Sequence, residues 1–318
     1  MAMVMTNCKN DETIPATIYA LGIEDIGGDY KALRYWKNGV ATTIADSLKS
    51  FYLSAGAVSG EDVYMAGNYR DYRTAYFKNN TRTELTDSSK FSLFISSIAV
   101  ANGDIYVAGI QSNGSKYVAK YWKNGIAVSL TDGTTDAYAH SIAISGTDVY
   151  VSGGEVNAAN VYVAKYWKNG TAVELATQNS DAGAIFISGN DVYIAGWTYN
   201  TIQSTAVYWK NGTIVTLGTR NSGTNSILVS GNNVYVTGFE SNGTHYVAKY
   251  WKNGTSVDLT DGMNDDYYAG AIAVDGSDVY VISETSYGPS ILWKNGVAVA
   301  PFDRTNSRIH IRSLYLKK

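Results

Sequence analysis

The sequence predicts an all-β fold built from seven repeated sheets. The first observation is a five-residue motif, Tyr121 to Gly125, whose aromatic second position recurs at residues 36, 77, 122, 167, 209, 251 and 293. The second is the spacing of these copies, which is 41, 45, 45, 42, 42 and 42 residues and is typical of repeat architectures. The third is composition, because 31 glycines and only three prolines suit short strands joined by tight turns.

One repeat unit, between Ser97 and Asp132, predicts four antiparallel strands. The two strands that come first are nearly continuously apolar, which indicates burial on both faces. Asn124-Gly125 tolerates positive φ at both positions, as a type I′ hairpin turn requires. The last strand alternates apolar and polar residues, the pattern of a strand half-exposed to water. The predicted strands, here called A to D, are residues 98–100, 104–109, 116–123 and 126–130.

A four-stranded meander of about 42 residues, repeated seven times, predicts a seven-bladed β-propeller. Radial closure removes the open end faces that a straight stack of such sheets would leave. We expect a single propeller domain over residues 16–318, preceded by a tail over residues 1–15. The first unit has strands B, C and D but no strand A, whereas residues 308–316 form an alternating segment near the C-terminus. We therefore expect the C-terminal segment to complete the first blade as its inner strand and to close the ring.

Two resemblances extend this interpretation. The segments Ser97–Asp132 and Ser226–Asp261 have identical residues at 22 of 36 aligned positions. With such similar units, the chain resembles bacterial extracellular β-propellers built from recently amplified blades. An apolar stretch leads to Cys8, and the following Lys9–Glu12 resembles the surface-export signal of Bacteroidetes lipoproteins. This resemblance implies a lipid-modified Cys8 and a place at the cell surface or outer membrane; without it, a soluble extracellular or periplasmic protein is expected. The alternative is a tail with an incidental cysteine.

Composition, charge and the absence of known motifs restrict the classes of partner and site that we expect. The net charge is −3 and no run of lysine or arginine forms a basic stripe, so a nucleic-acid partner is disfavoured. No apolar run approaches about 18 residues, so we expect no membrane-spanning segment. A single cysteine excludes an internal disulfide and paired-cysteine metal sites. The sequence shows no serine-nucleophile, metalloprotease or phosphate-binding motif, so it indicates no cofactor, no metal and no catalytic residues. We expect a monomer.

Residues fixed by the repeat have a structural interpretation. Each motif tryptophan is expected to pack between blades, and the lysine after it to be a solvated hairpin residue. An aspartate or asparagine precedes the strand-B tyrosine and is expected to accept backbone N–H groups in the A–B turn. Six equivalent residues cannot all be one catalytic acid; they are Asp62, Asp104, Asp148, Asp191, Asn233 and Asp278.

Functional variation is expected where the units differ. The B–C and D–A connections vary in length and composition and share one face of a propeller, so we place the binding surface on that face and the adjoining channel mouth. Aromatic rings interleaved with polar groups suit a glycan or a peptide. The alternative is that these tyrosines serve blade packing. The candidate ligand-binding residues are Tyr69, Arg70, Tyr72, Tyr138, His140, Trp197, Tyr199, Phe239, Tyr267, Tyr268 and Tyr287.

Three functions remain open at this point. The first is a non-catalytic binding or adhesion module that displays variable loops on one face, tethered at the cell surface through Cys8. The second is a glycoside hydrolase or lyase acting at the channel mouth, which needs two acidic groups from different blades within about 5–10 Å. The third is a scaffold with no specific ligand, natural or engineered. A uniform face favours the scaffold, and a clustered break in symmetry favours a site.

Overall fold

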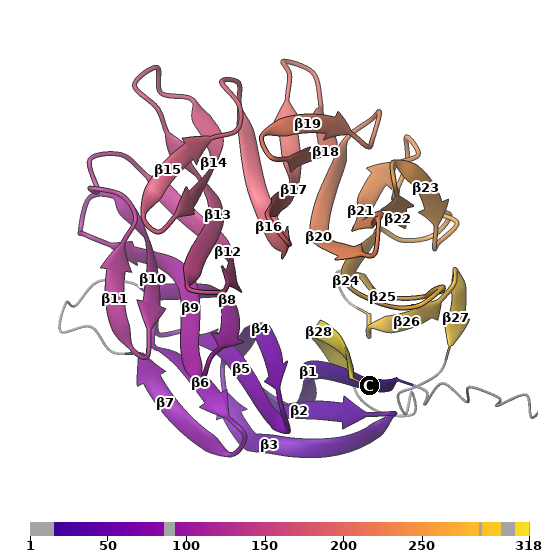
Figure 1. Cartoon of the computed structure of the whole chain (residues 1–318). Coiled ribbons are helices and arrows are strands. Elements are labelled where there is room, and N and C mark those ends of the chain that lie inside the picture. The colour runs from indigo at the N-terminus through magenta and orange to yellow at the C-terminus, as the bar shows by residue number, and fades with distance from the viewer. Residues whose placement is uncertain (1–15, 86–92, 286–287, 300–308, 318) are drawn as a thin grey trace, which may run out of the picture.

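A computed structural model of the chain describes residues 16–85, 93–285, 288–299 and 309–317. Seven four-stranded antiparallel sheets are arranged as blades around a common axis, as predicted (Figure 1). Sequence order runs round the ring from blade 1 to blade 7. Among the described residues there is no helix with the length and apolar content that a membrane crossing needs.

The strands occupy four concentric positions. The inner strands are β4 (Phe51–Ser59), β8 (Leu93–Ala101), β12 (Ala137–Ser145), β16 (Ser180–Ser188), β20 (Ser222–Ser230), β24 (Tyr267–Asp275) and β28 (Ile309–Lys317). The second strands are β1 (Thr17–Gly27), β5 (Asp62–Tyr69), β9 (Asp104–Ser112), β13 (Asp148–Val156), β17 (Asp191–Tyr199), β21 (Asn233–Ser241) and β25 (Asp278–Thr285). The third strands are β2 (Tyr30–Lys37), β6 (Thr74–Lys78), β10 (Tyr117–Lys123), β14 (Tyr162–Lys168), β18 (Ser204–Lys210), β22 (Tyr246–Lys252) and β26 (Ile291–Lys294). The outer strands are β3 (Val40–Lys49), β7 (Thr81–Leu85), β11 (Ile126–Ser129), β15 (Thr171–Glu174), β19 (Thr213–Thr216), β23 (Thr255–Asp258) and β27 (Val297–Val299).

The C-terminal strand closes the ring, as predicted. β28 pairs antiparallel with β1, so blade 1 joins the two ends of the chain (Figure 1). The closing strand also bonds to blade 2, because Ser313 Oγ accepts from the Gly56 N–H at 2.9 Å and Tyr315 donates to the Gly56 carbonyl at 2.6 Å. Lys317 adds an ion pair with Glu61. Seven inner strands therefore complete one continuous ring.

The hydrophobic core consists of seven clusters, one at each interface between neighbouring blades. Each cluster contains one motif aromatic, which confirms the prediction that this residue packs between blades. Trp167, for example, lies with Tyr106 and Ile142 between blades 3 and 4 and is 1% exposed. Burial of a large ring at every interface stabilises the ring as a whole, since aromatic side chains contribute most buried area per residue. The seven aromatics are Trp36, Phe77, Trp122, Trp167, Trp209, Trp251 and Trp293.

The hairpin asparagine clamps the third strand to the second. Asn124 and Gly125 have φ angles of 50° and 84°, as a type I′ turn requires. Asn124 Oδ1 accepts from the Ile105 N–H at 2.9 Å, and its Nδ2 donates to Asp104 at 2.8 Å. The same two bonds recur in five further blades, with Asn79, Asn169, Asn211, Asn253 and Asn295.

Two expectations about repeated charges are corrected here. The carboxylate of Asp104 accepts from the Asn124 side chain and pairs with Lys123 Nζ at 2.8 Å, so it serves the C–D hairpin where backbone contacts in the A–B turn were expected. Lys123 is not simply solvated, because its ammonium also lies 5.3 Å from the Tyr106 ring centroid. The hydrogen bond from Lys123 is the main reason that the pKa of Asp104 is lowered, and the hydrogen bond from Asn124 adds to the effect.

The inner and second strands extend further than the sequence predicts. Strand A of blade 3 covers Leu93–Ala101 and strand B covers Asp104–Ser112, each several residues longer than expected. Phe94 pairs with Ile110 and Leu93 with Gln111, in a segment whose polar residues suggested a loop. Pairing across the sheet, which a single segment does not reveal, extends both strands.

Every inner strand contains a β-bulge at the same point. In blade 4, Ala139 pairs with Gly153 and Ser141 with Ser152, so His140 between them has no partner across the sheet. The glycine makes the bulge possible, because a Cβ on Gly153 would overlap the Tyr138 carbonyl oxygen and lie 2.9 Å from its carbon. Blade 7 leaves both Gly270 and Ala271 unpaired. We call the first unpaired residue of each inner strand the bulge ring: Ser54, Ser96, His140, Gly183, Asn225, Gly270 and Arg312.

Candidate functional site

The two ends of the propeller differ. We call the end with the A–B and C–D turns the hairpin face, and the opposite end the mouth face. The bulge ring lies on the half of each inner strand that begins at the mouth face, since each inner strand follows a D–A connection. Two adjoining cavities line the axis there, of about 880 and about 500 Å³. Both are lined by Asn225 and Arg312, and the smaller also by Ser96, His140 and Gly183.

Blades 3 to 5 bring tyrosines, a histidine and a carboxylate together at the mouth. The ring of Tyr138 lies 5.6 Å from Tyr117, 5.7 Å from Tyr162 and 6.3 Å from His140, measured between ring centroids. His140 Nε2 lies 3.1 Å from a carboxylate oxygen of Asp181, on the next blade. Tyr162 donates to the other oxygen at 3.1 Å. Burial is the main reason that the pKa of the Tyr162 hydroxyl is raised, and the negative charge of Asp181 adds to the effect. The hydroxyl therefore stays protonated and acts as a hydrogen-bond donor.

Blades 6 and 7 form a second aromatic group. Phe239 lies 4.9 Å from Tyr246 and 5.0 Å from Tyr268, both edge to face. Tyr246 and Tyr268 are 5.6 Å apart and inclined by 43°, the same arrangement as Tyr117 and Tyr138 in the first group. Burial raises the pKa of Tyr268. Since Tyr268 also lines the larger cavity, this group connects the rim of the mouth to the channel.

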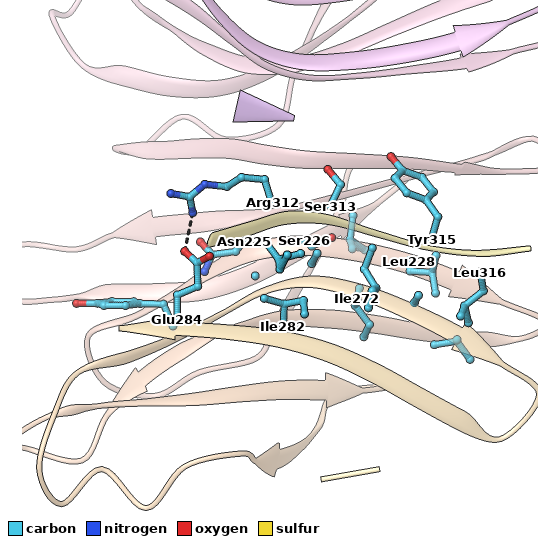
Figure 2. A pocket seen from close by; sticks show the side chains of 18 of the residues that line it. Asn225, Ser226, Leu228, Ile272, Ile282, Glu284, Arg312, Ser313, Tyr315 and Leu316 are labelled. Atoms are coloured by element: carbon cyan, nitrogen blue, oxygen red, sulfur yellow. Dashed lines mark hydrogen bonds and ion pairs between the residues drawn. The ribbon is translucent and has the colours of Figure 1, made fainter. Parts of the chain in front are cut away.

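The larger cavity has one charged end and one apolar wall. Arg312 donates from Nη1 to Glu284 at 2.7 Å, and Ser290 donates to the other Glu284 oxygen at 2.6 Å. Figure 2 shows this pair at one end of β28, with Leu228 and Leu316 towards the other end. The charged pair therefore lies at one end of the cavity, and the two leucines lie further along it.

The structure places the predicted residues in different environments. Tyr138 and His140 lie together in the first group, Phe239 and Tyr268 together in the second, and Trp197 lines the smaller cavity. Tyr72 is exposed and packs edge to face on Phe94, and Arg70 and Tyr199 are exposed on the mouth face apart from both groups. Tyr267 is half-buried against the core between blades 6 and 7. Tyr287 and Cys8 lie outside the described residues.

Tyr69 is placed in the core. Its side chain is 6% exposed, its ring packs edge to face on Phe51, and the guanidinium groups of Arg73 and Arg82 lie 4.7 and 5.0 Å from its centroid. This environment makes Tyr69 a packing residue between blades 1 and 2, which is the alternative that the sequence left open.

Sequence reasoning missed Asn225 and, above all, Arg312. A signal was present, because a glycine interrupts strand B in most units, and an isolated glycine inside a strand indicates a bulge or a close backbone approach. The bulge position then points to an inner-strand residue that differs between units: serine, histidine, glycine, asparagine or arginine. Arg312 was harder to find because it lies in the closing strand, outside the repeat alignment.

The described residues contain no group of three or more histidine, cysteine or acidic side chains arranged to hold a metal ion. Arginine, tyrosines, an amide and serine hydroxyls are instead the groups that converge on the cavities. Such groups bind by hydrogen bonding and ring stacking.

The solved structures that are similar to this chain include a natural and a designed protein. The β-propeller domain of the Trilobed protease from Pyrococcus furiosus, described as having an open velcro topology, is 9% identical, with a TM-score of 0.58 over 92% of this chain and 100% of that chain. The computationally designed Ika8 protein is 17% identical, with a TM-score of 0.53 over 96% of this chain and 92% of that chain. No protein-family model matches, and no curated protein is similar. At these identities the likeness shows the fold alone.

Proposed function

We propose that this protein is a non-catalytic binding module whose ligand docks on the mouth face. The observation that carries the proposal is the contrast between the two ends of the same seven blades. At the hairpin face the clamp of asparagine, aspartate, lysine and tyrosine is nearly uniform, which indicates a structural role. At the mouth, equivalent bulge positions hold serine, histidine, glycine, asparagine and arginine. A clustered break in symmetry favours a site over a scaffold without a ligand.

The residues at the mouth suit a glycan or a peptide. Half-buried tyrosine rings offer flat apolar faces, and carboxylate, amide and hydroxyl groups beside them can bind polar atoms of a ligand. Asp136, on the first group's loop, accepts from the Tyr117 N–H at 2.9 Å and from Lys116 at 3.1 Å, so that loop is held rigidly. Binding residues held by a rigid frame lose little entropy when a ligand binds.

A hydrolase or lyase is less well supported. Asp181 and Glu284 are the carboxylates among the described residues that line the two cavities. Each already accepts from protein donors: Asp181 from Tyr162, with His140 beside it, and Glu284 from Ser290 and Arg312. Glycosidases need one carboxylic acid that can protonate the leaving group. Two carboxylates fully occupied by protein groups do not supply it.

Attachment at the cell surface is a separate part of the proposal. It rests on the sequence from Cys8 to Glu12, which resembles a lipoprotein export signal. Expression in a bacterium of the Bacteroidetes type with a radiolabelled fatty acid tests it. Label in the wild-type protein that is absent from Cys8→Ser supports the tether, and an unlabelled wild-type protein rejects it.

The binding function is tested on glycan and peptide arrays. We expect the wild-type protein to retain ligands that a Tyr138→Ala/Tyr268→Ala variant loses at least tenfold, because each ring provides stacking area worth about 1 kcal/mol or more. The matched control is Lys123→Ala/Lys168→Ala on the hairpin face, which leaves binding unchanged. An absence of any ligand on both arrays, or equal loss in both variants, contradicts the proposal.

A further inference from the structure

We propose that the larger cavity binds the C-terminal residue of a peptide, with Arg312 reading the terminal carboxylate and the apolar wall accepting the last side chain. This inference rests on the proposed binding function and narrows its ligand to one class. It is carried by Arg312, by the leucines further along the cavity, and by the amide oxygen of Asn225, to which no described residue donates.

Arg312 lines the cavity and keeps one edge of its guanidinium free of bonds to the described residues. Its bulge position leaves it unpaired in the sheet, and its side chain is 44% exposed although the strand around it is largely buried. Glu284 accepts a hydrogen bond from Nη1 of this guanidinium only. No other described residue bonds to the guanidinium, so Nε and Nη2 remain for a ligand. These two N–H groups lie on one edge and match the two oxygens of a carboxylate.

Glu284 serves to orient the arginine. Its side chain is 15% exposed, and Ser290 holds its second oxygen. A guanidinium fixed in this way loses little conformational freedom when it binds. Arg312 is also the one lysine or arginine among the described residues lining either cavity. A ligand carboxylate that enters the channel therefore meets one cation at one defined place.

The apolar wall continues along the channel from Arg312. Leu228, Leu316 and Phe186 line the cavity and are only half-buried, so the structure leaves apolar surface facing it. Figure 2 shows Leu228, Ile272 and Leu316 along the same cavity as Arg312. Covering such surface favours an apolar side chain.

Asn225 supplies a contact for the peptide main chain. Its Nδ2 donates to the Ala269 carbonyl at 2.9 Å, which fixes the amide and leaves Oδ1 as an acceptor. The side chain is exposed at the bulge next to Ser226, and both residues line the cavity with Arg312. A peptide N–H is the donor that an isolated amide oxygen accepts. Carboxylate, backbone amide and apolar side chain occur together in the last residue of a peptide, whereas a sugar acid leaves the apolar wall uncovered.

The test compares peptides that differ in one group. Pentapeptides ending in leucine or phenylalanine are prepared as free acids and as C-terminal amides, and binding to the full-length protein is measured by calorimetry up to about 1 mM ligand. We expect the free acids to bind at least about tenfold more tightly, since a bidentate charge-assisted pair is lost on amidation. No variant is needed for this comparison, so it does not depend on the folding of an altered closing strand.

The second part of the test repeats this comparison with the Arg312→Gln variant. Arg82→Gln is the control, because Arg82 pairs with Glu84 on an exposed outer strand far from the channel. The acid-to-amide ratio should fall to about one in Arg312→Gln and persist in Arg82→Gln. Equal affinity of acids and amides for the wild-type protein overturns the inference, as does an absence of peptide binding. If a glycan or sugar acid then binds in a Tyr268-dependent way, the binding function stands and only the peptide assignment is lost.

Discussion

A strand-B glycine lies at the bulge in six blades, whereas blade 7 has Ser283 at the equivalent position, and Gly153 offers the sharpest test of what the glycine contributes. Gly153→Ala would place a methyl group in overlap with the Tyr138 carbonyl oxygen and 3.2 Å from the Ala139 Cα. Both neighbours are backbone, so neither can move aside like a flexible side chain. Overpacking of this kind costs about 1–3 kcal/mol, and the upper end applies because the bulge itself must open.

Gly183→Ala is the matched control in the next blade. The nearest atom to its added methyl group is the Ala195 carbonyl oxygen at 3.4 Å, an ordinary contact. We expect its free energy of unfolding to stay within about 0.5 kcal/mol of wild type. Alanine also lowers the conformational entropy of the unfolded chain, which offsets part of any loss in the folded state. Thermal unfolding followed by circular dichroism should show Gly153→Ala melting several degrees lower, at about 2–4 °C per kcal/mol or less for a chain of this length. Equal melting temperatures for the two variants would refute the explanation of the bulge.

Three further predictions concern stability. Trp167→Ala, at a position that is 1% exposed, should lower the free energy of unfolding measured by chemical denaturation by about 3–5 kcal/mol. A loss below about 1 kcal/mol would show that the tryptophan between the blades does not stabilise the ring. Ser313→Ala leaves the buried Gly56 N–H unsatisfied and should cost about 1–3 kcal/mol, with Ser226→Ala at the equivalent position of blade 6 as a near-neutral control. Lysine and asparagine contacts lower the pKa of the repeated aspartates below the ordinary value of 3.8, so their stabilisation is full above that value and is lost as pH falls through the lowered pKa. A variant with asparagine at all five positions, as blade 6 has at Asn233, should therefore melt below wild type at pH 7, and the difference in melting temperature should shrink as pH falls below 3.8. A difference that stays constant with pH would contradict this. The five residues are Asp62, Asp104, Asp148, Asp191 and Asp278.

The sequence predicted what is local and periodic. Asn124-Gly125 identifies its hairpin because few residues tolerate two positive φ angles in succession. The recurring motif aromatic, tryptophan in six units and Phe77 in one, predicts the number of blades. The missing first strand A, with an alternating segment near the C-terminus, predicts closure by β28. These features are encoded within a few residues or in their repetition.

Contacts between distant segments could not be predicted in the same way. The pairing of Phe94 with Ile110 depends on register across the sheet, and the separation of buried Tyr69 from exposed Tyr72 depends on Arg73 and Arg82 folding over one ring. Arg312 enters the site only because β28 completes a blade begun some 300 residues earlier, from Thr17 to Ile309. For the same reason, cavity lining follows from closure of the ring and not from any one unit.

Hydroxyl-radical footprinting of the full-length protein, with and without a ligand found on the arrays, tests most directly whether the mouth is where this protein binds. Mass spectrometry should show protection of Trp197 and Tyr268 at the mouth. Ile126 and Val40, which follow hairpin turns and are 74% and 70% exposed, should react equally in both samples. Protection of Ile126 and Val40, with none at Trp197 and Tyr268, would place the ligand on the hairpin face and contradict the account.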